Sequence, residues 1–124
     1  MQFTTAFVAA VAALSTMALA APIESRADAH SGVATYFYQN GNPGSCGNYN
    51  SDDAWIVAVS QEHHDSSNCG KTITIEYNGV QKVATIADTC PGCGFYDLDL
   101  SSGLFGSFAD HSLGELNIKW WANW

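Results

Sequence analysis

ATIADTCPGCGFYDLDLS, residues 84–101, is the stretch around which this chain is organised. Its first residues predict a strand that ends at Asp88, Cys90-Pro-Gly-Cys93 predicts a tight turn, and a second short strand carries Asp97 and Asp99. We expect this arrangement to place Asp88 and Asp99 near each other at one end of a sheet. Two such carboxylates are able to do acid–base work on a glycosidic bond, or to bind sugar hydroxyls without any chemistry.

A β-hairpin is predicted immediately before this stretch. Asn78-Gly79 is the strongest short-range signal for a two-residue turn, and it separates the apolar-rich segments Lys71–Tyr77 and Val80–Asp88. A turn of two residues pairs Tyr77 with Val80, and Thr74 with Val83.

The rest of the chain adds further short elements. Strands are predicted over Ser31–Tyr38, Trp55–Ser60 and Gly114–Trp120, and one helical turn is compatible with residues 61–68. Ser101 is a predicted N-cap of a short helix that Gly103 and Gly106 weaken. About six short strands with one short helix indicate an all-β protein built as a small closed or nearly closed barrel.

The N-terminal residues predict secretion. Residues 3–20 are almost wholly apolar or small, and Ala18-Leu-Ala20 is a typical cleavage site, so residues 1–20 are interpreted as a signal peptide. Residues 21–28 form a short propeptide-like segment, and residues 29–124 are expected to fold as one extracellular, monomeric domain.

The charge balance restricts the partners. The sequence holds 12 Asp and Glu against four Lys and Arg, with a net charge of −8. This balance argues against nucleic acid and anionic membrane surfaces, whose phosphates need Lys and Arg contacts. Neutral glycans and proteins are the expected partners.

Four cysteines in a secreted chain predict two disulfides, for which three connectivities exist. The hairpin register alone allows Cys69–Cys90. Cys90-Pro-Gly-Cys93 also fits a redox motif, but the βαβ context of such motifs is missing from the predicted elements, so a structural disulfide is favoured. His63-His64 has no third ligand at metal-binding spacing. We therefore expect no metal and no cofactor.

Five short motifs occur together in an order that resembles a known family. The chain is similar to the RlpA-like double-psi β-barrel proteins, and within them to fungal single-domain expansin-like proteins (loosenins), which are related to barwin and to the first domain of expansins. The motifs are Gly32-x-Ala34-Thr35-Tyr36, Ser45-Cys46-Gly47, Asn68-Cys69-Gly70-Lys71, Asp88-Thr-Cys-Pro-Gly-Cys-Gly94 and Asp97-Leu-Asp-Leu-Ser101.

The resemblance implies a six-stranded double-psi β-barrel with one or two short helices and a shallow groove for polysaccharide. Thr35, Asp88 and Asp99 match groove positions, and Asp99 matches the carboxylate that serves as the acid in related inverting glucanases. Where many expansins carry an aromatic residue two places after the first Asp, this chain has Cys90. The resemblance also implies the disulfides Cys46–Cys69 and Cys90–Cys93.

The remaining candidates for the polysaccharide site are less specific. Asp97 has two alternative interpretations: a solvent-facing neighbour of Asp99, which is the favoured one, or a third groove carboxylate, because it shares the face of Asp99 in a regular strand. Several aromatic residues are candidates for stacking on sugar rings, against core or rim packing as the alternative. They are Tyr36, Tyr38, Tyr49, Trp55, Phe95, Tyr96, Trp121 and Trp124, of which Tyr36 and Tyr96 are included in the predicted site.

Three functions follow as hypotheses. The first is a secreted expansin-like protein that binds and loosens cell-wall polysaccharide with little or no hydrolysis. The second is a protein-binding module, such as an inhibitor of papain-type cysteine proteases. The third is a weak glycan-cleaving enzyme, a glycoside hydrolase or lytic transglycosylase, in which Asp99 is the acid and Asp88 the base.

Overall fold

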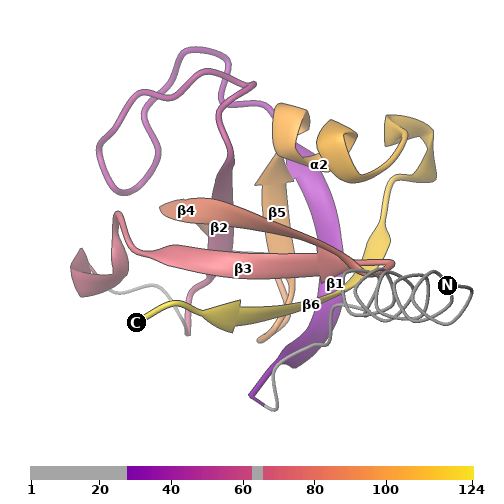
Figure 1. The fold of residues 1–124 in the computed structure, drawn as a ribbon. Helices are drawn as coiled ribbons and strands as arrows, with labels where there is room; N and C mark the ends of the chain where they lie inside the picture. Colours follow the sequence, from indigo (N-terminus) through magenta and orange to yellow (C-terminus); the bar gives the residue numbers. More distant parts are fainter. Residues whose placement is uncertain (1–27, 63–65) are drawn as a thin grey trace, which may run out of the picture.

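The computed structural model describes residues 28–62 and 66–124, and its strands close into one barrel in the order β1-β5-β2-β4-β3-β6 (Figure 1). The strands are β1 (His30–Phe37), β2 (Ile56–Ser60), β3 (Thr72–Tyr77), β4 (Val80–Cys90), β5 (Leu98–Ser101) and β6 (Leu116–Ala122). The helix α2 (Ser102–Phe108) and two 3₁₀ turns, η1 (Ser66–Asn68) and η2 (His111–Leu113), complete the described elements. The predicted signal peptide, residues 21–27 and His63-His64 lie outside the described residues.

The strand pairings are those of a double-psi β-barrel. β1 pairs with β5 in parallel, and β2 pairs with β4 in parallel. The pairings β1/β6, β2/β5, β3/β4 and β3/β6 are antiparallel. The all-β class and the six-stranded double-psi barrel, predicted with one or two short helices, are therefore confirmed.

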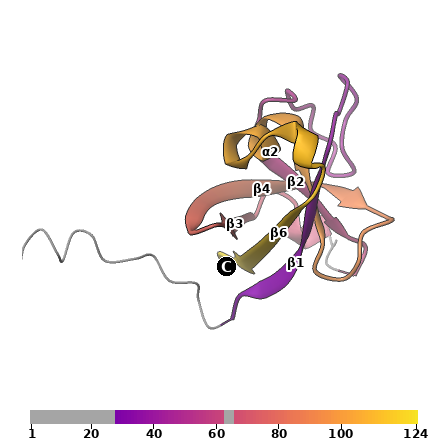
Figure 2. The same ribbon diagram turned by 90° about the vertical axis from the view of Figure 1, so that its right-hand side faces the viewer.

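The barrel interior is filled by inward-facing residues from all six strands, which alternate with outward-facing ones along each strand. Ala34, Val57, Val59, Leu98 and Leu100 are each fully buried, and the residues between them point outward. The helix α2 lies over one end of the barrel, where it buries Leu104 and Phe105 (Figures 1 and 2). Its predicted N-cap is confirmed, because the Ser101 hydroxyl accepts a hydrogen bond from the Leu104 N–H at 3.2 Å.

The predicted hairpin is also confirmed. Tyr77 pairs with Val80, and Thr74 pairs with Val83. Asn78 has a φ of 50° and Gly79 a φ of 80°, which is the backbone that a type I′ turn requires at both central positions.

Several predicted strand boundaries are wrong, and β6 is one case, because it spans Leu116–Ala122 where Gly114–Trp120 was predicted. β4 does not end at Asp88 but continues to Cys90, because β2 runs alongside it and pairs Val59 with Thr89 and Ser60 with Cys90. β5 begins at Leu98, so Asp97 belongs to the preceding turn, where its N–H donates to the Gly94 carbonyl at 3.1 Å.

Both disulfides form as the family resemblance implies. Cys46 is bonded to Cys69 with a Cα–Cα distance of 5.7 Å, and Cys90 to Cys93 with one of 5.4 Å. The first ties the loop after β1 to the segment before β3, and the second closes the turn between β4 and β5. In residues 28–62 and 66–124, no helix has the length and hydropathy to cross a membrane.

Candidate functional site

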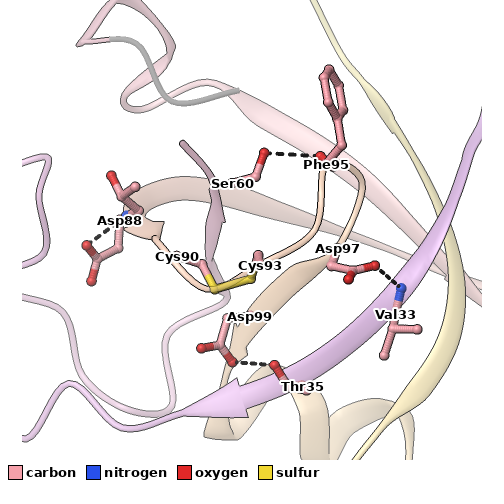
Figure 3. The surroundings of a disulfide bond; sticks show 10 residues. Val33, Thr35, Ser60, Asp88, Cys90, Cys93, Phe95, Asp97 and Asp99 are labelled. Carbon is pink, nitrogen blue, oxygen red and sulfur yellow. Dashed lines mark hydrogen bonds between the residues drawn. A yellow bond between two sulfur atoms is a disulfide. The ribbon is translucent and has the colours of Figure 1, made fainter. Parts of the chain in front are cut away.

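One transverse row of residues brings the predicted groove residues together on the outer face of the barrel. Thr35 of β1 pairs with Asp99 of β5, Asp99 pairs with Ala58 of β2, and Ala58 pairs with Asp88 of β4. Residues paired in this way point to the same face of a sheet. Asp88 and Asp99 are separated by one strand, so their Cα atoms lie about 9–10 Å apart, two strand spacings. Figure 3 shows both carboxylates beside the Cys90–Cys93 disulfide.

A β-bulge in β4 aims Asp88 at this face. Val57 pairs with Ile86 but the next residue, Ala58, pairs with Asp88, so Ala87 is the extra residue. A regular ladder would pair Ala58 with Ala87 and turn Asp88 toward the barrel interior, because side chains alternate along a strand. The bulge therefore places a carboxylate outside where strict alternation would bury it.

Asp88 is held by three hydrogen bonds from the chain. Its Oδ1 atom accepts from the Ser45 N–H at 2.9 Å and from the Thr89 N–H at 2.8 Å. Its Oδ2 atom accepts from Gln39 Nε2 at 2.9 Å. Gln39 is itself buried, and its N–H donates to Asp52 Oδ1 at 2.7 Å. Asp88 thus anchors the loop that follows β1.

Asp99 has a different environment. Its Oδ1 atom accepts one hydrogen bond, from the Thr35 hydroxyl at 2.9 Å (Figure 3). Burial raises the pKa of Asp99, the hydrogen bond from Thr35 opposes this rise, and the negative charge of Asp88 adds to it. The surroundings of Asp99 therefore favour a bound proton more than water does. It is suited to donate a hydrogen bond or a proton to a sugar oxygen.

Asp97 lines a cleft of about 250 Å³, and it also has a structural role. Its Oδ1 atom accepts a hydrogen bond from the Val33 N–H at 2.9 Å, which ties the turn before β5 to β1 (Figure 3). The predicted solvent-facing alternative does not describe this half-buried carboxylate. The cleft is lined by Val33, Thr35, Cys90, Gly92, Cys93, Asp97 and Glu115.

The two aromatic residues of the predicted site lie apart from each other. Tyr36 alternates with Thr35, and its ring packs on Phe105 and His111 below α2, with centroid distances of 4.7 and 4.8 Å. Tyr96 lies in the turn after Cys93 and is 38% exposed. Its ring stacks on His30 with a centroid distance of 4.3 Å. Tyr96 directly precedes Asp97, which lines the cleft, but is not itself a lining residue, whereas Tyr36 packs against the core.

The other aromatic candidates also divide into buried and exposed side chains. Trp121 is buried, and Phe95 forms an edge contact with Tyr96 at 4.7 Å. The exposed members are Tyr38, Tyr49, Trp55, Phe95 and Trp124. Among the described residues, no group of three or more His, Cys, Asp or Glu side chains is placed to hold a metal ion.

Sequence reasoning missed three residues of this region. Gln39 and Ser45 bind Asp88 from positions 49 and 43 residues away, and the long loop gives no signal for such contacts. Glu115 lines the cleft because it directly precedes Leu116, which pairs with Ala34. Its position at the cleft could be predicted only with knowledge of the pairing register between β1 and β6.

Comparison with known sequences gives two fungal relatives. Allergen Asp f 7 of Aspergillus fumigatus is 43% identical over 83 residues, which are 65% of this chain and 31% of the relative. An Allergen Asp f 7 homolog of Arthroderma benhamiae is 32% identical over 74 residues, 55% of this chain and 26% of the relative. The chain thus spans less than a third of the length of these curated relatives. No protein-family model matches the sequence.

Comparison with solved structures supports an expansin-like barrel. The ligand-free expansin of Clavibacter michiganensis has a TM-score of 0.69 and 25% identity, over 76% of this chain and 50% of that one. A variant of this expansin in complex with cellohexaose has the same TM-score and coverage with 24% identity. The Streptomyces papain inhibitor has a TM-score of 0.67 and 25% identity, over 76% of this chain and 93% of that one.

Proposed function

We propose that this chain is a secreted, expansin-like protein that binds and loosens neutral cell-wall polysaccharide with little or no hydrolysis. The row of Thr35, Asp99 and Asp88 on the outer barrel face, beside an open cleft, carries the proposal. The likeness to an expansin that was solved with cellohexaose supports a glycan as the ligand. Cellulose, chitin and other β-glucans are the candidate polysaccharides, and no nucleic acid or membrane partner is proposed.

The state of Asp88 argues for binding over catalysis. An inverting glycosidase needs an acid and a base with a water molecule between them, and Asp99 and Asp88 lie on the same outer face with one strand between them. A base must also have a free lone pair directed at that water. Asp88 instead directs its oxygens to Gln39, Ser45 and Thr89, so it holds a loop in place. Three of the about four lone-pair sites of Asp88 are thus occupied by the chain itself, which favours a structural role for this carboxylate over that of a base.

The protease-inhibitor alternative has its own support. The likeness to the Streptomyces papain inhibitor extends over 93% of that protein, which is a greater share than for the expansin. A protein-binding role would use exposed loops, and the exposed Tyr38 and Tyr49 flank the loop that Asp88 anchors. Weak glycan cleavage with Asp99 as the acid is the third possibility.

Three measurements on the purified protein separate these functions: retention on polysaccharide, inhibition of papain and release of reducing sugar. The purified protein is incubated with insoluble cellulose, chitin and β-glucan, and the bound fraction is measured beside inhibition of papain. We expect retention on at least one polysaccharide, no inhibition of papain and no release of reducing sugar. Inhibition of papain without retention on any polysaccharide would replace the proposal by the inhibitor function.

A further inference from the structure

A second, larger cleft lies on the other side of β1. It has a volume of about 560 Å³, a size typical of sites for small ligands. It is lined by Ser31, Gly32, Val33, Glu76, Asn78, Gly79, Asn117, Ile118 and Lys119. The proposed polysaccharide site uses none of these residues except Val33.

The strand register explains how this cleft is built. Lys119 of β6 pairs with Ser31 of β1 on one side and with Glu76 of β3 on the other. One step along β1 on the same face, Val33 pairs with Asn117. These outward positions form two adjacent transverse rows, and the hairpin turn at Asn78-Gly79 closes the far side.

Val33 joins the two clefts. It lines both of them, and its N–H donates to Asp97 Oδ1 at 2.9 Å. Thr35, two residues further along β1, donates its hydroxyl hydrogen bond to Asp99. A ligand that extends from Thr35 along the outer face of β1 to Val33 therefore reaches Asn117, which is paired with Val33 on β6.

The chemistry of the larger cleft matches sugar hydroxyls. The smaller cleft offers the carboxylates Asp97 and Glu115, which accept hydrogen bonds when ionised. The larger one combines a carboxylate with an ammonium group and two amides, from Glu76, Lys119, Asn78 and Asn117. Each sugar hydroxyl both donates and accepts, so a lining with donors and acceptors and no net charge suits a neutral glycan.

We propose that the larger cleft is a second glycan subsite, which continues the Thr35–Asp99 site across Val33 and holds the extra rings of a longer oligosaccharide. This inference rests on the proposed function, because it assumes that glycan binds at Thr35–Asp99. Asn117 and Lys119 are the residues that select for chain length, and both are exposed on β6.

Amide NMR titration of the full chain with cellobiose and with cellohexaose tests the proposal. We expect cellobiose to shift the amide signals of Thr35 and Asp99, and cellohexaose to shift those of Asn117 and Lys119 as well. Lys119→Ala removes the ammonium donor and should weaken cellohexaose binding about three- to tenfold, the factor expected for one net hydrogen bond, and leave cellobiose binding unchanged. Lys71→Ala is the matched control, because it removes the same kind of side chain beside Trp124 and should change neither affinity.

The possible failures are distinguishable. If cellohexaose shifts Thr35 and Asp99 but neither Asn117 nor Lys119, the second subsite is wrong and the proposed function stands. If neither sugar shifts any of these signals, glycan binding itself is wrong for this ligand class, and the subsite falls with it. A response of Asn117 and Lys119 to papain, in the absence of a response to sugar, would assign the cleft to a protein partner.

Discussion

The Asp99 carboxyl group makes the clearest distinction between binding and catalysis. Asp99→Asn keeps the size of the side chain and an oxygen that accepts the hydrogen bond from the Thr35 hydroxyl, but it removes the acidic proton. General acid–base catalysis contributes about 10²–10⁴-fold to a rate. We expect neither the native protein nor the variant to release reducing sugar, and the weakening of filter paper or wall fragments to fall in the variant. Sugar release that depends on Asp99 would contradict the binding mechanism.

The same residue predicts a pH dependence of stability. Because burial raises the pKa of Asp99 in the folded state, the folded chain binds this proton more tightly than the unfolded chain does. The contribution of Asp99 to the free energy of unfolding is thus complete below its unfolded pKa and is lost as the pH rises through its folded pKa.

Asp99→Asn should therefore be more stable than the native protein at neutral pH, and the gain should shrink as the pH falls through the raised pKa of Asp99. Urea unfolding at a series of pH values measures this difference. Asp53→Asn, the same substitution at an exposed carboxylate, is the control variant. A gain for Asp99→Asn that does not change with pH would show that burial does not perturb this group.

At the scale of elements, the loop after β1 depends on Asp88. Asp88→Ala removes the acceptor of the hydrogen bonds from Gln39, Ser45 and Thr89, and it leaves the buried Gln39 amide without that partner. Lost hydrogen bonds of this kind cost about 1–3 kcal/mol. We expect that loss in urea unfolding, together with faster hydrogen exchange at Ser45. Asp53→Ala is the control, and an equal loss in both variants would refute the anchoring role.

A close approach between β1 and the turn before β5 gives a second prediction at this scale. A Cβ atom on Gly32 would lie 2.0 Å from the Tyr96 carbonyl oxygen, whereas one on Gly92 would meet nothing within 4 Å. Gly32→Ala must displace backbone and should cost about 1–3 kcal/mol or more. Gly92→Ala should be close to neutral. Thermal unfolding of the two variants measures the difference, and equal midpoints would contradict the contact.

Local patterns explain which elements were predictable. The Asn78-Gly79 turn, the Ser101 cap and the period-two strands depend on neighbours within a few residues, and all are present. The bulge at Ala87 was not predictable, because it exists only through the pairing of β4 with β2. The position of Asp97 outside β5 follows from the same turn that hydrogen-bonds it to Gly94.

The candidate site shows the same division. The strand-turn-strand pattern predicts Asp88 and Asp99, and the motif resemblance adds Thr35, but the register that aligns the three joins strands far apart in the sequence. Tyr36 was included because aromatic residues are common in glycan sites. Its contact with Phe105 depends on the placement of α2, which the local sequence does not determine.

At the scale of the whole molecule, the two disulfides are expected to contribute unequally. A small secreted domain buries a limited core and gains from such cross-links. The chain-entropy model relates the stabilisation to the size of the closed loop. The sequence separation is 23 for Cys46–Cys69 and 3 for Cys90–Cys93. The model therefore gives about 3 kcal/mol for the first and about 2 kcal/mol for the second.

Replacement of each cysteine pair by serine tests this difference and separates stability from binding. The Cys46/Cys69 variant should lose more unfolding free energy, because its loop is the longer one. The Cys90/Cys93 variant should lose less stability but more polysaccharide retention, because this disulfide lines the cleft beside Thr35 and Asp97. Urea unfolding and polysaccharide pull-down of both variants give the two quantities. Equal retention in the two variants would show that the turn between β4 and β5 takes no part in binding, and would move the polysaccharide site away from this cleft.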